Sequence, residues 1–225
     1  IRPEKLIAAA KARGVSVTVA IAKACSLAMQ KHPTLNNTYQ PVDRIVERAN
    51  HDFGLAVSAD GGGLVVPVLR NIESKSLQQL QTEWADLMPR ARVRKLAPAE
   101  YANPTFTISN MGMLGVNHFT AIPTPGIAAI MAIAANGADG MPVNITADHR
   151  VVNGAHVAMY LVDLKEAIEN PDAWMDGAAA APAATAAAAV AAPAVKAIPE
   201  GTWDVAVVVI GGGPGGEAYA RDLVE

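Results

Sequence analysis

Apolar side chains recur every three or four positions in several stretches of the chain, the pattern of helices that bury one face. The pattern predicts four helices, over residues 3–13, 17–31, 77–87 and 157–168. Gly14 closes the first helix, and Pro89 is expected to break the third. The fourth is expected to end at Asn170-Pro171, because proline disfavours helical backbone in the residue before it.

Other apolar runs are short and bounded by turn residues, which is typical of buried strands. They predict strands over residues 53–58, 64–69, 105–109, 127–134 and 143–147. The sequence Asp60-Gly61-Gly62-Gly63 separates the first two and predicts a tight turn. Residues 136–142 contain Asn-Gly and Asp-Gly pairs, which tolerate positive φ. A hairpin is therefore expected between the last two strands.

The composition limits the classes of function. The chain has 225 residues and a net charge of −3, which speaks against a nucleic-acid binder. Its one cysteine, Cys25, rules out an internal disulfide framework and fits a reducing compartment, and no Cys and His spacing resembles a zinc site. Cys25 lies in a helical apolar stripe, so we expect a core thiol. Without such a Cys and His spacing, no metal is expected. No run has the length and hydropathy of a membrane span, so no membrane partner is expected.

The composition changes abruptly after Trp174. Residues 177–200 are almost wholly alanine with scattered proline, which leaves too little apolar area to offset the entropy cost of ordering. We expect a disordered Ala/Pro linker there. Beyond it, an apolar strand pattern over residues 204–210 runs into a glycine loop that fits GxGxxG, as in a dinucleotide-binding βα unit. The glycines that match are Gly211, Gly213 and Gly216.

The motif Asp148-His149-Arg150-Val151-Val152-Asn153-Gly154 lies between a strand pattern and a helix pattern. The ordinary pKa of histidine is about 6.5, so a held imidazole can accept a proton from a thiol and return it to a leaving group. In an extended segment, Asp148 and Arg150 would share one face and could pair, while His149 points the other way. A single histidine is more often structural than catalytic, so its neighbours in the sequence must decide.

Four separated motifs, at residues 54–71, 95–101, 105–122 and 148–154, resemble the catalytic domain of dihydrolipoamide acyltransferases in the order of that family. These enzymes are the acyl-transferring cores of 2-oxoacid dehydrogenase complexes. The resemblance covers roughly residues 1–174, and residues 1–176 are the expected domain. It implies an α/β fold of the chloramphenicol acetyltransferase type, a two-layer sandwich in which helices flank a mixed sheet on one side.

The resemblance also implies the chemistry. His149 would deprotonate the attacking thiol of coenzyme A or dihydrolipoamide, and Ser109 would stabilise the oxyanion of the tetrahedral intermediate. Coenzyme A and the lipoyl group would be the substrates, and acetyl, as in the pyruvate dehydrogenase complex, is the expected acyl group. A homotrimer with its active site between subunits is implied, as the unit of a cubic or icosahedral core. Lipoyl domains and peripheral dehydrogenase subunits would be its partners, in bacterial cytoplasm or in the matrix of a mitochondrion or plastid.

The chain departs from the family pattern in three places. Asn153 stands where most members have aspartate, and it offers a carbonyl acceptor and amide donors but no charge. We expect it to complete the catalytic set of His149 and Ser109, with Asp148, Arg150 and Gly154 as structural neighbours. The 136–142 connection is shorter than is usual in the family. The family's opening strand and helix are missing, and with them an arginine that usually pairs near this turn.

Two other functions are compatible with parts of the sequence. The chain could be a scaffold that presents peripheral enzymes, with transferase activity lost through Asn153 and the missing N-terminal segment, although His149 and Ser109 are both present. A flavin oxidoreductase rests only on residues 201–225, which resemble the start of dihydrolipoamide dehydrogenase. FAD is expected only if that domain were complete, because the second strand, the acidic ribose-binding residue and the redox cysteine pair are absent.

A basic cluster follows the third predicted helix, and it could meet the phosphates of coenzyme A. A solvated face is the favoured interpretation, since runs of like charge usually lie in water. The cluster consists of Arg90, Arg92, Arg94 and Lys95.

Overall fold

The structure is a computed structural model that describes residues 1–40, 44–176 and 207–210. The predicted linker over residues 177–200 and the glycine loop at 211–216 lie outside the described residues. Five α-helices are present in this part of the chain: α1 (Glu4–Ala12), α2 (Val17–Lys31), α3 (Leu77–Arg92), α4 (Gly154–Glu169) and α5 (Asp172–Met175). Four short 3-10 helices join other elements, at Pro33–Asn36, Ile72–Ser74, Pro98–Glu100 and Gly112–Leu114.

The four predicted helices are confirmed, but the predicted break at Pro89 is wrong. Helix α3 continues through Pro89 to Arg92. Leu87 and Ala91, on either side of the proline, are both buried, so the apolar face continues past the position where proline removes one backbone hydrogen bond. At the start of α3, the Ser76 side chain accepts a hydrogen bond from the backbone N–H of Gln79, and the Gln79 side chain accepts one from the backbone N–H of Ser76. These two bonds form a capping box.

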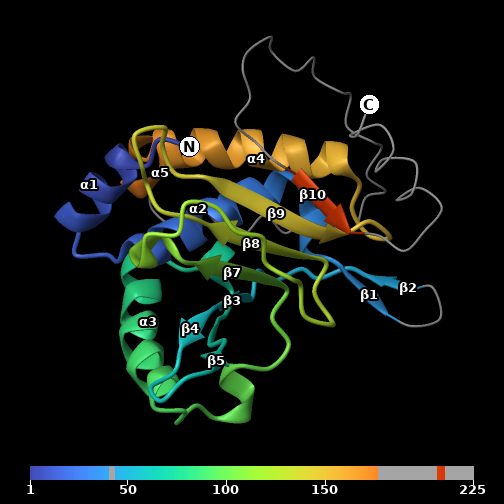
Figure 1. The fold of residues 1–225 in the computed structure, drawn as a ribbon, viewed down its shortest axis with the longest axis horizontal. Coiled ribbons are helices and arrows are strands. Elements are labelled where there is room, and N and C mark those ends of the chain that lie inside the picture. Colours follow the sequence, from blue (N-terminus) through green and yellow to red (C-terminus); the bar gives the residue numbers. More distant parts are fainter. Residues whose placement is uncertain (41–43, 177–206, 211–225) are drawn as a thin grey trace.

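The central sheet is mixed, as predicted (Figure 1). Its strand order is β10-β9-β8-β7-β3-β6, and its strands are β3 (Phe53–Leu55), β6 (Val68–Leu69), β7 (Phe106–Asn110), β8 (Ala129–Ile133), β9 (Val143–Asp148) and β10 (Val207–Ile210). The pairs β3–β7, β7–β8 and β9–β10 are parallel, whereas β3–β6 and β8–β9 are antiparallel. The predicted hairpin joins β8 to β9, and Gly137 and Gly140 form a bridge within its turn. Residues 207–210, which we expected in a dinucleotide-binding unit, form the edge strand beside β9.

Two predicted strands divide into shorter ones. The run 53–58 becomes β3 and β4 (Val57–Ser58), and the run 64–69 becomes β5 (Leu64–Val65) and β6. Strands β4 and β5 form a separate antiparallel pair around the predicted turn. Pro67, which separates β5 from β6, has no N–H to donate to a ladder. A second two-stranded sheet, β1 (Thr38–Gln40) with β2 (Arg44–Val46), was not predicted.

The two faces of the central sheet differ in chemistry. Phe106 of β7 and Met131 of β8 point toward the helices: Phe106 lies 6.3 Å from the ring of Tyr160 in α4, and the Met131 sulfur lies 3.9 Å from that of Cys25 in α2. Cys25 is buried, and its burial raises the pKa of the thiol to about 12, so it is the core thiol that we expected. Because side chains alternate along a strand, Thr107 and Ser109 point to the opposite face. Helices α2 and α4 therefore pack on one side of the sheet.

No single helix among residues 1–40, 44–176 and 207–210 meets the length and hydropathy of a membrane span; α1 and α2 together do so by composition, but the pair is bent by 115°. The same residues hold no group of three or more His, Cys, Asp or Glu side chains placed to bind a metal ion.

Candidate active site

The residues after β9 form a tight turn. The backbone carbonyl of Asp148 accepts the N–H of Val151 at 2.9 Å and that of Val152 at 3.0 Å. Val152 is buried, so the turn is anchored in the core at its far end. The segment is not extended, so the condition under which His149 would point away from Asp148 and Arg150 is not met; these backbone bonds fold the chain back before α4 begins. His149 lies half-buried in this turn.

Asp148 and Arg150 do form the expected pair, through the geometry of the turn. The backbone N–H of Arg150 and its Nε donate to Asp148 Oδ1 at 3.0 and 2.9 Å, and its Nη2 donates to Oδ2 at 2.6 Å. These hydrogen bonds are the main reason that the pKa of Asp148 lies below its usual range and that of Arg150 above it. The carboxylate thus stays charged beside His149 at neutral pH.

Asn153 caps helix α4. Its side-chain Oδ1 accepts the backbone N–H of His156 at 3.0 Å, and Gly154 is the first residue of the helix. This bond satisfies one of the N–H groups that a helix start leaves without a partner. Asn153 therefore fixes the join between the His149 turn and α4 by its carbonyl oxygen, a role that needs no charge.

Ser109 lies half-buried near the end of β7. In register with it are Ala132 on β8 and Asn144 on β9, so the three side chains form one row on the face opposite the helices. Asn144 is 4% exposed, and its Nδ2 donates to the backbone carbonyl of Phe119 at 2.6 Å. Phe119 belongs to the β7–β8 connection (residues 111–128), so Asn144 ties this connection to the row of Ser109.

Asn144 was not among the predicted site residues. A polar residue inside the apolar run 143–147 was the available signal, and it was read only as part of a strand. Three buried side-chain oxygens on this face of the described sheet make no hydrogen bond, and buried polar groups are usually paired. They are Thr107 Oγ1, Asn144 Oδ1 and Thr146 Oγ1.

Ser109 and His149 lie toward opposite ends of the sheet. Ser109 is level with Asn144, whereas His149 follows Asp148, four residues further along β9. At about 3.3 Å per residue and about 4.8 Å per strand, the backbones of Ser109 and Asp148 are about 16 Å apart. Even the summed reach of a serine and a histidine side chain leaves several ångströms more than a hydrogen bond. A single chain therefore does not bring the two groups together.

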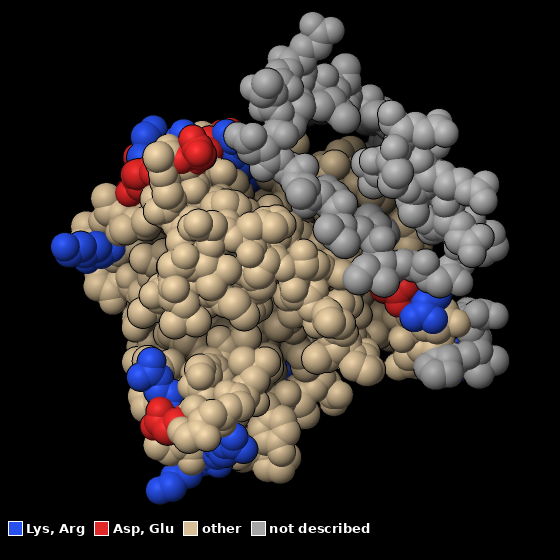
Figure 2. Space-filling view, viewed as in Figure 1, with Lys and Arg blue, Asp and Glu red and all other residues tan. Residues whose placement is uncertain are grey.

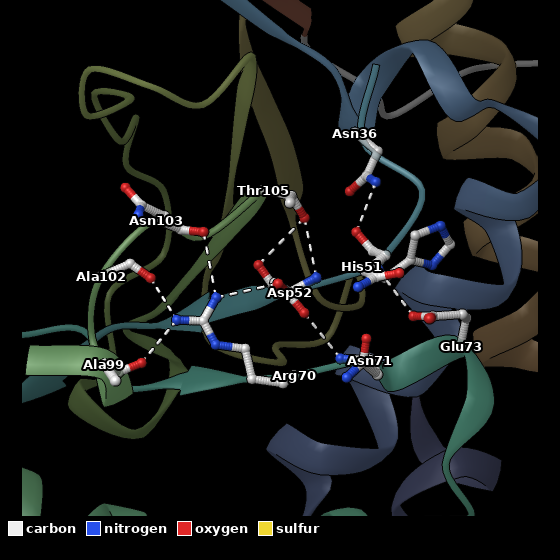
Figure 3. Close-up of polar contacts among 11 residues, drawn as sticks. Asn36, His51, Asp52, Arg70, Asn71, Glu73, Ala99, Ala102, Asn103 and Thr105 are labelled. Atoms are coloured by element: carbon white, nitrogen blue, oxygen red, sulfur yellow. Dashed lines mark hydrogen bonds and ion pairs between the residues drawn. The ribbon is translucent and has the colours of Figure 1, made fainter. Parts of the chain in front are cut away.

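A polar network that the sequence analysis missed holds the start of β7 (Figure 3). Asp52 Oδ2 accepts a hydrogen bond from Arg70 Nη1 at 3.1 Å, and the backbone carbonyl of Asp52 accepts the N–H of Thr105 at 2.7 Å. The Arg70 guanidinium also donates to three backbone carbonyls, those of Ala99, Ala102 and Asn103. Because Thr105 directly precedes β7, the network fixes the strand that carries Ser109.

Two members of the basic cluster contact groups of this chain. Arg90 forms ion pairs with Asp86 and with Glu100, the latter at 2.6 Å. The Arg90 hydrogen bonds are the main cause that lowers the pKa of Glu100 to about 2. Arg94 Nη2 donates to the Gly62 carbonyl at 2.5 Å. These contacts favour a self-paired surface over a site for coenzyme A phosphates.

Residues 3–176 match the family model for the catalytic domain of 2-oxoacid dehydrogenase acyltransferases. A chloroplastic acetyltransferase component of the pyruvate dehydrogenase complex from Arabidopsis thaliana is 41% identical over 174 residues. The match covers 72% of this chain and 37% of the relative. The chain thus spans little more than a third of that relative's length.

Solved structures of the same family share this fold. The cubic core of a pyruvate dehydrogenase multienzyme complex superposes with a TM-score of 0.65 at 29% identity, over 76% of each chain. The dihydrolipoamide acetyltransferase of Azotobacter vinelandii gives the same TM-score at 28% identity, again over 76% of each chain. Chloramphenicol acetyltransferase, at 15% identity and a TM-score of 0.50 over 70% of this chain and 79% of its own, shows the likeness of fold alone. By sequence and by fold, this chain belongs to the family of 2-oxoacid dehydrogenase acyltransferases, whose catalytic domain it carries.

Proposed function

We propose that the chain moves an acetyl group between dihydrolipoamide and coenzyme A, as the core of a pyruvate dehydrogenase complex. The observation that carries the proposal is the retention of His149 and Ser109 within a domain of this family. Work on the Azotobacter vinelandii enzyme concerned the catalytic role of a serine, a histidine and an asparagine, the last two four positions apart. His149 and Asn153 have the same spacing, which supports Asn153 as a functional residue in this position.

The reaction needs a base and an oxyanion donor. A thiol has a pKa of about 8.5, so at neutral pH His149 accepts the S–H proton as sulfur attacks the thioester carbonyl. The electron pair of the carbonyl moves onto oxygen, and the Ser109 hydroxyl donates a hydrogen bond to that oxyanion. When the intermediate collapses, the C–S bond to the departing thiol breaks, and the imidazolium returns the proton to that sulfur.

The separation of Ser109 from His149 implies that each active site takes His149 from one chain and Ser109 from a second copy. A closed cyclic assembly such as a trimer repeats this contact at each interface. The face viewed in Figure 2 supports such an assembly, because its centre, over the sheet and the β7–β8 connection, carries no charged side chain. Residues 101–138 contain no Lys, Arg, Asp or Glu. Met113, Leu114 and Ile122 in this stretch are 93%, 77% and 79% exposed, and exposed apolar side chains of this kind mark interaction surfaces.

Subunit mixing tests this arrangement. His149→Ala and Ser109→Ala chains each keep about one hundredth of wild-type turnover or less when alone. They are unfolded together and refolded as one assembly. Random mixing then leaves about one site in four with His149 from one chain and Ser109 from another, so about a quarter of wild-type turnover returns. The assay measures transfer of acetyl from acetyl coenzyme A to dihydrolipoamide. A mixture as inactive as its components, with co-assembly shown by tagged chains, would contradict the shared site.

The scaffold alternative makes a different prediction. A scaffold would form the assembly with no turnover in the wild-type chain, and Asn153→Asp would restore turnover where Asn153 alone is the cause of the loss. Wild-type turnover that His149→Ala abolishes, in an assembly of unchanged size, decides for the enzyme.

We further propose that residues 1–176 are the acyltransferase domain, on the family match, that 177–200 are a linker, on composition, and that 201–225 are a segment of FAD-binding type, on the glycine pattern. That segment would hold FAD only as part of a complete domain. Lipoyl domains and peripheral dehydrogenase subunits are the proposed partners, within a larger cubic or icosahedral core. The curated relatives are bacterial, mitochondrial and chloroplastic, so the proposed location is bacterial cytoplasm or an organelle matrix.

A further inference from the structure

An aromatic side chain from a distant part of the sequence lies against the His149 turn. The centre of the Tyr39 ring is 3.7 Å from Cζ of Arg150, a cation–π distance. Tyr39 lies on β1, in the β1–β2 hairpin, where it pairs with Ile45. The hairpin projects beside the end of β9 in Figure 1. The turn is thus bounded on one side by an element more than a hundred residues away in sequence.

The base of the hairpin is held in the core. Asn36, which is fully buried, donates from Nδ2 to the backbone carbonyls of Arg48 and Asn50 at 2.7 and 2.9 Å. Asn37 Oδ1 accepts the backbone N–H of Arg48 at 3.3 Å. With both ends of the hairpin tied together, Tyr39 is carried by an anchored element.

Arg150 needs such a support because its side chain is 54% exposed. An ion pair with one exposed partner is weak, since water screens it and the long side chain loses entropy when it is held. The Tyr39 ring covers one face of the guanidinium while Asp148 binds its edge. Together these contacts hold the residues on both sides of His149 in one geometry.

We propose that Tyr39 is a positioning residue, which acts through Arg150 and Asp148 to hold the His149 imidazole in the orientation that accepts the thiol proton. This inference rests on the proposed function. A small rotation of a general base reduces the rate of the chemical step while substrate binding is retained. Tyr39 contacts Arg150 through its ring and also through a side-chain hydrogen bond, which is the last of the causes that raise the pKa of Arg150. Phenylalanine at position 39 keeps the ring contact and should retain most of the effect, whereas leucine should not.

The test compares Tyr39→Leu with Tyr39→Phe in the assembled protein. Tyr39→Leu lowers kcat for acetyl transfer about 5- to 10-fold with the KM for both substrates unchanged, and Tyr39→Phe keeps kcat within about twofold of wild type. In the Arg150→Met background the Tyr39→Leu change has no further effect, because the contact is already lost.

A second readout does not depend on turnover. The imidazole NMR signals of His149, assigned by their absence in His149→Ala, shift in Tyr39→Leu and stay in place in Tyr39→Phe. Equal kcat in Tyr39→Leu and wild type, a defect of equal size in Tyr39→Phe, or unmoved imidazole signals in Tyr39→Leu would each overturn the inference. An inactive wild type would contradict the proposed function, whereas the imidazole signals would still test the positioning.

Discussion

The two ends of the central sheet carry different kinds of side chain. At the Ser109 end, a row of small and polar side chains crosses three strands, and one buried amide holds the neighbouring connection. At the His149 end, an ion pair, a helix cap and an aromatic ring surround one imidazole. Since charge is concentrated at one end, the two ends suit the two tasks of the proposed mechanism, in which one moves a proton and the other donates a hydrogen bond to an oxyanion.

The comparison also shows why neither end is a complete site. Strand β9 runs antiparallel to β7 and β8, so the turn after β9 lies at the end where those strands begin. Ser109 lies near the end of β7, on the far side. The topology places the proposed base and the proposed oxyanion donor apart within one chain, and a second copy can bring them together.

Substitution at the His149 end should have the largest effect. His149→Ala is expected to lower kcat about 1000-fold or more at pH 7, because the attacking thiol must then ionise without a base. Raising the pH toward the thiol pKa of about 8.5 supplies thiolate and should recover part of this loss. A pH profile of acetyl transfer measures the recovery. A variant with wild-type turnover at pH 7 would remove His149 from the mechanism.

Substitution at the Ser109 end should lower the rate without recovery at high pH. Ser109→Ala is expected to lower kcat about 100-fold, by the loss of one oxyanion donor, and to lower kcat/KM by the same factor. Its pH profile should keep the shape of the wild-type profile, because the base is intact. If high pH rescued Ser109→Ala as well as His149→Ala, the two ends would not have separate roles.

The sequence predicted the parts of this arrangement better than their relation. Helices α1, α2 and α4 and strands β7, β8 and β9 follow from apolar spacing, which reports burial residue by residue. The path of α3 through Pro89 did not follow, because burial of Ala91 depends on tertiary packing. The distance between Ser109 and His149 depends on strand order and direction, which local patterns do not encode.

The residues that support the site were harder to predict than the candidates themselves. His149 and Ser109 were identified by motifs, whereas Asn144 and Tyr39 act through contacts with residues distant in sequence. The polar Asn144 inside an apolar run is a signal of a buried polar group, but it does not say which residue that group contacts. The strand register shows where Asn144 lies, and the position of the β1–β2 hairpin shows which residue Tyr39 contacts.

The hydrogen bond from Asn144 to the Phe119 carbonyl, at the Ser109 end, can be removed by two substitutions that differ in their expected cost in stability. Asn144→Asp replaces the donor to the Phe119 carbonyl with a buried negative charge, and it should reduce the free energy of unfolding by about 3 kcal/mol. Asn144→Leu also loses the donor but removes the oxygen that makes no hydrogen bond, so a loss of about 1 kcal/mol is expected. Urea unfolding measures both. Equal losses in the two variants would show that the amide does not hold the connection.

Loss of the Asn153 helix cap, at the His149 end, should reduce the free energy of unfolding by less than Asn144→Asp does. Asn153→Ala removes the acceptor for the His156 N–H and should reduce the free energy of unfolding by about 1 kcal/mol. Asn153→Asp keeps an acceptor and adds a negative charge at the N-terminus of α4, so its stability should equal or slightly exceed that of the wild type. Thermal unfolding of the three proteins gives the order. A destabilised Asn153→Asp would mean that the amide donors matter as well.

The smallest expected effect is the pH dependence of the Asp148–Arg150 pair. The pKa of Asp148 is lowered in the folded protein, mainly by its hydrogen bonds with Arg150, so its contribution to stability is present above the ordinary carboxyl pKa of about 3.9. That contribution is lost as the pH falls through the lowered value, and Asp148→Asn lacks it at every pH. Other carboxylates, such as Glu100, also lose stabilising pairs in acid, so the wild type must be compared with the variant at each pH. The difference in urea midpoint should be largest at pH 6 and shrink toward pH 3, and it corresponds to less than about 1 kcal/mol because Arg150 is half exposed. A difference that stayed constant over this range would show that the pair contributes through packing and not through charge.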